Sequence, residues 1–272
     1  MLIDTHAHLH FSEEIDEKTG EKTQLGYSDV ADVIARANDA GVGRIINIGV
    51  TPEDSRAALK LSANRDFSVL KTGVKLYATA GLHPHEAFMG DKALDEIHDL
   101  AEDVIAIGEC GLDYFKNHSS KEDQEHALRQ QIEIALEHNL PLVFHVRDAW
   151  DDFFKILKEY PDARGVVHSF TGHPQEVDKI LAHSGELYFG LNGIMTFTKD
   201  DSQIEAAKLI PDNRLLLETD SPFLAPAPKR GRRNEPAEVT LVAGFLAELR
   251  GQGVESLASS TTANAIRLFE LE

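Results

Sequence analysis

The sequence predicts a (β/α)8 barrel, the TIM-barrel fold, formed as a single domain by all 272 residues. Eight short apolar runs alternate with amphipathic segments, as strands and helices do in a repeated β–α chain. The runs are nearly continuous in apolar residues, which is typical of strands buried on both faces of a parallel sheet. The length also fits, because α/β barrels of roughly 250 residues fold as one domain.

The eight predicted strands recur about every thirty residues along the chain. They are Leu2–Asp4, Arg44–Val50, Leu76–Leu82, Val104–Cys110, Leu142–Val146, Gly165–Phe170, Leu187–Leu191 and Arg214–Glu218. An open doubly wound sheet is the alternative. Eight units and the lack of a dinucleotide-binding fingerprint favour the barrel.

Helices are predicted between the strands because apolar residues recur at helical spacing, as Leu128, Ile132 and Leu136 do. The segments are Asp29–Ala40, Pro52–Asn64, Asp91–Glu102, Lys121–His138, Ala149–Tyr160, Pro174–His183 and Asp201–Ile210, and two closing helices are Val239–Arg250 and Leu257–Phe269. Boundary residues agree: Pro52 stands at a helix start and Gly41 follows a helix end.

Two polar stretches interrupt this alternation. Ser12–Gly26 is rich in acidic residues and is expected to be an exposed loop after the first strand. Ala225–Glu235 follows the eighth strand and carries four positive charges within five residues, at Lys229, Arg230, Arg232 and Arg233. If the acidic stretch lies over the barrel mouth, it disfavours a long polyanion there.

The composition limits the classes of function. Twenty-seven basic against 46 acidic residues give a net charge of −19, which repels polyanions on average, whereas a general nucleic-acid-binding surface is basic. Hydrophobic residues make up 42% of the chain, which excludes a disordered protein. No run reaches the ~18–20 apolar residues of a membrane span, and no signal peptide pattern is visible. The single cysteine, Cys110, excludes an internal disulfide. We expect a cytoplasmic monomer that does not bind membranes.

Polar residues end six of the eight predicted strands, where the chemistry of such barrels is found. Five histidines and two carboxylates stand there: His6, His8, His83, His145, His168, Glu109 and Asp220. His6 and His8 are two residues apart in a strand and therefore face the same side. Such a pair of imidazoles is a good bidentate ligand for a transition metal.

The motifs around these residues resemble those of the TatD-type metal-dependent deoxyribonucleases, part of the wider amidohydrolase-like group of metal barrels. They are, in order, Asp-Thr-His-Ala-His-Leu, Gly-Leu-His-Pro-His, Gly-Glu-Cys-Gly-Leu-Asp-Tyr, Leu-Pro-Leu-Val-Phe-His-Val-Arg-Asp-Ala, His-Ser-Phe-Thr-Gly and Leu-Leu-Glu-Thr-Asp-Ser-Pro-Phe-Leu-Ala-Pro. The resemblance runs from residue 2 to about residue 269. It implies a TIM barrel, two divalent metal ions and hydrolysis of DNA phosphodiesters, with 3′ exonuclease action on single strands.

The resemblance also implies a role for each metal-site residue. His6 and His8, with Asp220 alongside, are the expected ligands of the first metal, and His145 and His168 those of the second. Glu109 is the expected bridge, and Asp220 also accepts the proton of the attacking water. Mixed imidazole and carboxylate ligands suit Zn or Mn in the site better than Mg, although Mg can still support activity.

Substrate contacts are predicted from the same strand ends. By family position, His83 contacts substrate phosphate. Arg147 shares a face with His145 and either binds phosphate or pairs with Asp148 or Asp113. Arg230, Arg232 and Arg233 either guide the phosphate backbone or form a solvated charged loop.

Glu218 faces the same side as Asp220 and either orients a histidine ligand or packs in the core. The histidines for which no role is predicted are His10, His98, His118, His126, His138, His173 and His183. Two other functions stay open. One is a two-metal hydrolase of an amide, ester, lactone, phosphotriester or aminoacyl-tRNA bond, and the other is a non-catalytic binding protein on a retained barrel. Glu109, in place of the bridging lysine common in that wider group, favours the nuclease.

Overall fold

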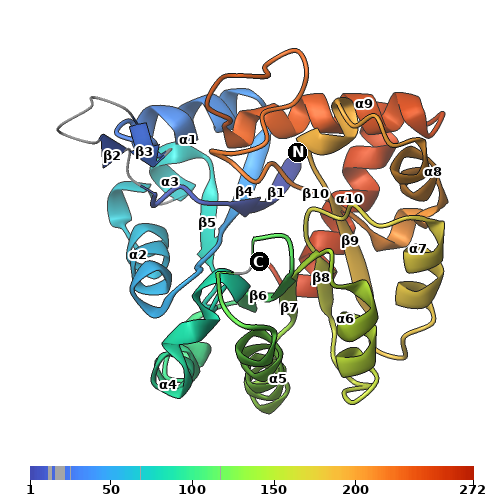
Figure 1. Ribbon diagram of the computed structural model, residues 1–272. Helices are drawn as coiled ribbons and strands as arrows, with labels where there is room; N and C mark the ends of the chain where they lie inside the picture. Colours follow the sequence, from blue (N-terminus) through green and yellow to red (C-terminus); the bar gives the residue numbers. More distant parts are fainter. Residues whose placement is uncertain (12–13, 16–21, 25, 68, 117) are drawn as a thin grey trace.

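The computed structural model describes residues 1–11, 14–15, 22–24, 26–67, 69–116 and 118–272. Eight parallel strands with helices outside them confirm the predicted barrel (Figure 1). The strands are β1 (Leu2–Ala7), β4 (Val42–Asn47), β5 (Lys75–Ala78), β6 (Ile107–Asp113), β7 (Leu142–Arg147), β8 (Gly165–Val167), β9 (Leu187–Leu191) and β10 (Leu215–Leu217).

The barrel closes at two seams. Ladders join β1, β4 and β5 on one side and β6 to β10 on the other. Single parallel bridges between Ala80 and Ile107 and between Ala7 and Ser221 connect these two sheets. At the second seam the amide of Asp220 donates to the carbonyl of His6 at 2.9 Å. Closure therefore places the end of the first strand beside the segment that follows the last one.

The helices form the outer layer (Figure 1). They are α1 (Val30–Asp39), α2 (Pro52–Ser62), α3 (Val69–Thr72), α4 (Asp91–His98), α5 (Lys121–Glu137), α6 (Trp150–Leu157), α7 (Pro174–Leu181), α8 (Asp201–Leu209), α9 (Val239–Leu249) and α10 (Val254–Phe269). Side-chain caps fix several starts: Thr51 accepts from the amide of Asp54 at 3.1 Å before α2, and Ser120 from that of Asp123 at 3.0 Å before α5. These bonds satisfy amides that a helix leaves unpaired in its first turn.

The interior of the barrel is filled at one end. Ile3, Ile46, Val143 and Tyr188 from the strands form one buried cluster with Phe269 of α10. Ile3, Val143 and Tyr188 each lie at the first or second position of their strands, so α10 closes the end where these strands begin. The end where the strands finish is left for polar side chains.

The acidic stretch Ser12–Gly26 differs from the loop that we expect. Glu14–Ile15 (β2) and Lys22–Gln24 (β3) pair as two short antiparallel strands. The prediction for positions 12–13, 16–21 and 25 of this stretch lies outside the described residues. In the part of the chain that the structure describes, no helix is long and apolar enough to cross a membrane.

Candidate metal centre

The seven predicted side chains meet at the carboxyl ends of the strands. β1 carries His6 and leads directly to His8, β6 carries Glu109 and β7 carries His145. His168 follows β8 directly, while His83 and Asp220 lie in the segments after β5 and β10. Closure of the barrel explains the meeting, because parallel strands all end at the same rim.

The first group of ligand atoms surrounds Asp220. Its Oδ1 lies 3.6 Å from Nε2 of His6 and 3.6 Å from Nε2 of His8. Nε2 of His6 also lies 3.4 Å from Oε2 of Glu109. Ligand atoms bound at ~2.0–2.2 Å around one tetrahedral ion are about 3.3–3.6 Å apart. The spacing is thus too long for good hydrogen bonds and matches the edges of a metal coordination shell.

His6 supports the same interpretation. Its side chain is fully buried, and neither ring nitrogen has a hydrogen-bond partner among the described residues. An unpaired buried polar atom costs roughly 1–3 kcal/mol. A metal ion would satisfy Nε2, so the donor set fits the metal that the sequence predicts.

The second group lies on the other oxygen of Glu109. Oε1 is 2.8 Å from Nδ1 of His145, 3.4 Å from Nε2 of His168 and 3.5 Å from Nε2 of His83. Glu109 therefore turns Oε2 toward His6 and Oε1 toward these three imidazoles. This is the orientation that a carboxylate bridging two ions requires.

Hydrogen bonds at the far side of each ring decide which nitrogen is free to bind a metal. Nδ1 of His8 bonds the carbonyl of Ile48 at 3.0 Å, so this nitrogen carries the proton and Nε2 is the free one. Nε2 of His145 bonds Oδ2 of Asp113 at 3.1 Å, so Nδ1 is the nitrogen that faces Glu109, which it contacts at 2.8 Å.

The carboxylate of Glu218 approaches the far side of the His168 ring as an ion pair. Nδ1 of His168 lies 3.1 Å from Oε1 of Glu218, and Nε2 is the nitrogen that faces Glu109, at 3.4 Å from its Oε1. The ring also stacks on His6, with centroids 3.5 Å apart. A nitrogen of His168 groups with ligand atoms of His6 and Asp220. The structure thus places His168 between the two predicted metal positions.

His83 is oriented the opposite way. Its Nδ1 accepts a hydrogen bond from the amide of His85 at 3.1 Å. Burial lowers the pKa of His83 to about 3, so the ring is neutral at pH 7. A neutral ring that accepts at Nδ1 carries its proton on Nε2. Although His83 lies in one group with Glu109 and His145, the nitrogen that faces them is a donor and not a free ligand.

Glu218 is held in place by a buried polar network. Its Oε1 accepts from the amide of Ser169 at 2.7 Å and from Nδ2 of Asn192 at 3.2 Å. The carboxylate lies directly over Gly190 in β9, where any Cβ would overlap it. Of the two possible roles, the structure supports orientation of His168. The roles of Ser169 and Asn192 could not be predicted from the sequence, because their partner Glu218 lies more than twenty residues away.

Burial and neighbouring charges shift the pKa values of the site residues in opposite directions. Burial alone would raise the pKa of Glu109, but the imidazoles of His168 and His83 hold it well below its usual range. Burial would likewise raise the pKa of Asp220, and His8 and His168 keep it low. Burial disfavours the charged form of His168, yet Glu218 and Glu109 together raise its pKa to about 10. The site therefore holds ionised carboxylates, the form that binds cations.

Arg147 does not form either of the ion pairs that we considered. Asp113 contacts His145 and His85 instead, each at 3.1 Å. The exposed guanidinium of Arg147 stacks on the ring of Phe115, 3.8 Å from its centroid. Stacking leaves its N–H groups directed to the side of the ring, which is compatible with a phosphate contact.

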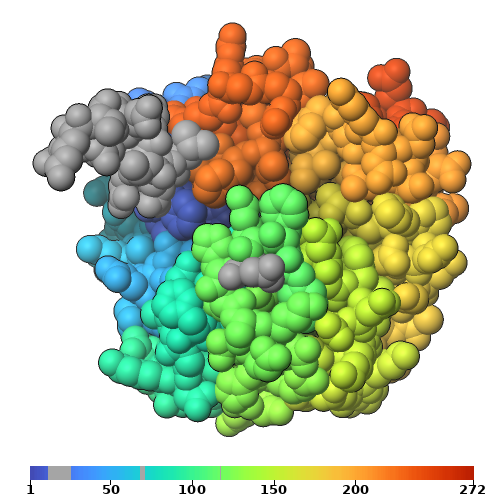
Figure 2. Space-filling view, in the orientation of Figure 1, coloured from blue at the N-terminus to red at the C-terminus, as the bar shows by residue number. Residues whose placement is uncertain are grey.

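The basic loop, residues Lys229 to Arg233, is only partly available for contacts with a substrate. It belongs to the orange segment that projects from the surface in Figure 2. Arg233 pairs with Asp29 at 2.8 Å and with Glu235 at 3.1 Å. Arg230 stacks on the ring of Phe197 at 3.8 Å, and Arg232 is exposed. The predicted substrate role is therefore better supported for Arg230 and Arg232 than for Arg233, whose charge is already neutralised.

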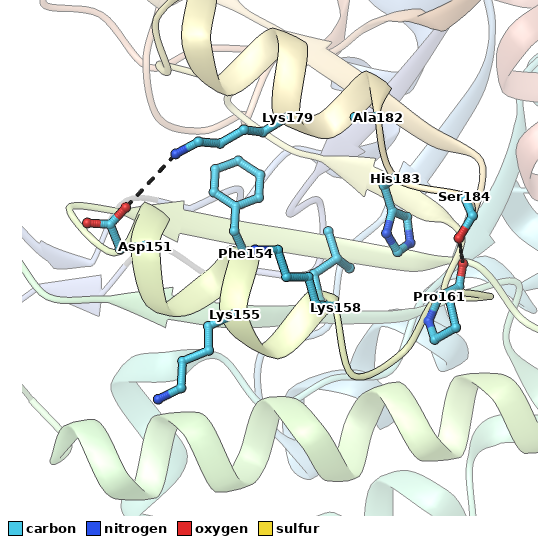
Figure 3. A pocket seen from close by; sticks show the side chains of 10 residues that line it. Asp151, Phe154, Lys155, Lys158, Pro161, Lys179, Ala182, His183 and Ser184 are labelled. Atoms are coloured by element: carbon cyan, nitrogen blue, oxygen red, sulfur yellow. Dashed lines mark hydrogen bonds and ion pairs between the residues drawn. The ribbon is translucent and has the colours of Figure 1, made fainter.

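A separate groove of about 510 Å³ lies between α6 and α7 (Figure 3). Phe154 and Leu157 give it an apolar lining, and an ion pair of 4.0 Å between Lys179 and Asp151 spans its edge. None of the predicted site residues lines it. It is distinct from the metal centre.

A barrel with imidazoles and carboxylates gathered at its strand ends defines the class of metal-dependent hydrolases. The family model described as TatD related DNase matches residues 3–270. The chain belongs to this family, as the motifs predict.

Relatives with similar sequences or structures support this membership. An uncharacterized metal-dependent hydrolase of Bacillus subtilis, YabD, is 40% identical over 276 residues and covers 100% of both chains. The 3'-5' ssDNA/RNA exonuclease TatD of Escherichia coli is 38% identical over 251 residues, covering 89% of this chain and 93% of the relative. The crystal structure of the TatD homolog YJJV of Escherichia coli matches with a TM-score of 0.84 and 29% identity, covering 100% of this chain and 98% of that one.

Proposed function

We propose that this chain is a nuclease that hydrolyses phosphodiester bonds of single-stranded DNA from the 3′ end, with two divalent metal ions. The observation that carries the proposal is Glu109, whose two oxygens face two separate groups of imidazoles. The substrate class and polarity are supported by the name of the Escherichia coli relative, a 3'-5' ssDNA/RNA exonuclease.

In this proposal His6, His8 and Asp220 would hold the first ion, His145 and His168 would hold the second, and Glu109 would contribute a carboxylate to both. When bound, two such ions supply positive charge to the attacking and leaving oxygens and lower the pKa of water at the site. Zn²⁺ or Mn²⁺ suits the imidazole-rich donor set, and Mg²⁺ remains an ion to test for activity.

Side chains of the protein accept the proton of the attacking water and bind the phosphate. Asp220 is ionised at neutral pH and only 15% exposed in its side chain, so it is placed to accept the proton of the attacking water. His83 presents an Nε2–H donor beside the carboxylate bridge and orients a phosphate oxygen through a neutral hydrogen bond. Arg147, Arg230 and Arg232 bind the backbone further from the bond that is cleaved.

We also propose that the enzyme acts as a monomeric, single-domain protein in the cytoplasm. The only cysteine, Cys110, is buried, and its thiol lies 3.7 Å from the carbonyl of Val143. A chain without an internal disulfide suits a reducing compartment. Light scattering of the purified protein measures the oligomeric state directly.

The deciding experiment follows the hydrolysis of single-stranded DNA labelled at either end. Metal-stripped protein is titrated with Mg²⁺, Mn²⁺ or Zn²⁺, beside Glu109→Ala and the exposed control Glu102→Ala. We expect one or more ions to restore cleavage in the wild type and in Glu102→Ala, but not in Glu109→Ala. Shortening from the 3′ end supports the polarity. No cleavage by protein shown to bind two ions would refute the nuclease and direct the search to ester and amide substrates.

A further inference from the structure

A second cluster of metal-binding side chains lies outside the catalytic centre. His98 is the last residue of α4, Glu137 is the last residue of α5, and His138 follows it as the helix cap. One ligand atom of each residue lies within 4.8 Å of the other two. The sequence predicts no role for His98 or His138, because the two lie forty positions apart and neither ends a strand.

We propose that His98, Glu137 and His138 bind one divalent transition-metal ion of the Zn²⁺ type. Two imidazoles and one carboxylate form a donor set that zinc accepts readily, with water completing the shell. Nε2 of His98 lies 3.4 Å from Oε2 of Glu137, which is already the spacing of two ligands around one ion, about 3.3–3.6 Å.

His138 supplies an independent observation. Its Nε2 is shielded from solvent and has no hydrogen-bond partner within the ranges that the structure describes. The ring meets that of His98 edge to face, with centroids 5.1 Å apart. A buried ring nitrogen without a partner is costly, and an ion between the two rings would satisfy it.

The helix ends favour a cation at this point. α4 and α5 pack side by side (Figure 1), and the last residues of both belong to the cluster. The carboxyl end of a helix carries a partial negative charge of roughly half a unit. Two such ends converge here with the carboxylate of Glu137. Closer to where these helices begin, His126 pairs with Asp91 at 2.6 Å. Among the described residues this pair is not part of a group of three or more possible metal ligands.

The cluster is remote from catalysis. His98 lies before β6 and His138 lies before β7, whereas Glu109 and His145 lie within these strands. The cluster therefore lies toward the end of the barrel opposite the catalytic mouth, as helix ends do in this fold. An ion here would join α4 to α5 and stabilise the folded state without touching substrate.

The test measures Zn²⁺ per chain by equilibrium dialysis of the full-length protein, using wild type, His98→Ala/His138→Ala and the control His126→Ala. We expect the double variant to bind one ion fewer than wild type, and His126→Ala to bind the same number as wild type. Mn²⁺-dependent hydrolysis should be equal in all three. Equal Zn²⁺ content in wild type and the double variant would overturn the proposal.

A milder variant guards against unfolding. Glu137 is 66% exposed in its side chain, so Glu137→Gln should fold normally while it removes the anionic ligand. We expect its affinity for this ion to fall at least tenfold. We also expect Zn²⁺ to raise the melting temperature of the wild type by more than that of His98→Ala/His138→Ala, because the catalytic centre is the same in both. Retention of full affinity by Glu137→Gln, or an equal increment with and without the two histidines, would contradict the site.

Discussion

Gly190 lies in β9 against the buried carboxylate of Glu218, and Gly190→Ala is expected to displace that carboxylate. A Cβ at this position would overlap Oε2 of Glu218 and lie 2.8 Å from its Cδ. The carboxylate cannot retreat freely, because Oε1 accepts hydrogen bonds from Ser169 and Asn192. Relief of the overlap therefore breaks the network that orients His168.

The magnitude follows from two costs. Overpacking a dense core destabilises by about 1–3 kcal/mol. Leaving a buried polar group unsatisfied costs about 1–3 kcal/mol more, and the two overlap because one movement causes both. We expect the free energy of unfolding to fall by about 2–4 kcal/mol. For a chain of this size the melting temperature should drop by roughly 4–8 °C.

The assay is denaturant unfolding of the metal-free protein at pH 7, with Gly244→Ala as the matched control. Gly244 lies inside α9, and a Cβ there meets no atom within 4 Å. The same substitution should stabilise this helix by up to about 1 kcal/mol. Opposite signs at the two glycines are the expected result. A change of less than about 0.5 kcal/mol for Gly190→Ala would refute the claim that Glu218 is pinned.

The metal centre, the basic loop and the surface ion pairs give three further predictions. Asp220→Asn should lower kcat at least about a hundredfold while the circular dichroism spectrum stays unchanged, and full activity would exclude Asp220 as proton acceptor. Arg230→Ala/Arg232→Ala should raise KM for DNA and reduce the salt slope by about one per lost phosphate contact, whereas an unchanged slope would indicate a solvated loop. Hydrogen bonds from Arg233, and then from Arg36, hold the pKa of Asp29 at about 2, below its ordinary value of 3.8. Asp29 therefore stabilises the fold above pH 4 and loses this contribution as the pH falls toward 2. The deficit of Asp29→Asn in unfolding free energy, about 1 kcal/mol or less for so exposed a pair, should shrink between pH 6 and pH 2.5.

The barrel could be predicted because each strand is apolar on both faces, a pattern that needs no knowledge of its neighbours. Helix boundaries were less well defined. The last helix begins at Val254 and not at Leu257, since Val254 is 49% exposed and its first turn adds nothing to the apolar face. The paired strands Glu14–Ile15 and Lys22–Gln24 lack the apolar alternation that would have predicted them.

The convergence of the candidate ligands was predictable for a similar reason, because the strand ends share one rim. The direction of each imidazole was not. It depends on partners far along the chain, such as Asp113 for His145 and Glu218 for His168. Arg233 shows the same limit, since its partner Asp29 lies more than two hundred residues away.

The net charge of −19 is compatible with a polyanionic substrate only if binding is confined to the mouth of the barrel. There, two divalent ions would bring four positive charges against the two negative charges of Glu109 and Asp220. Arg230 and Arg232 add positive charge near the rim, while the rest of the acidic surface repels nucleic acid. Under the proposed function, a DNA strand is then held at the end that is being cleaved and not along its length. Metal-free protein should accordingly bind DNA weakly, because the field that attracts the phosphate is supplied largely by the ions.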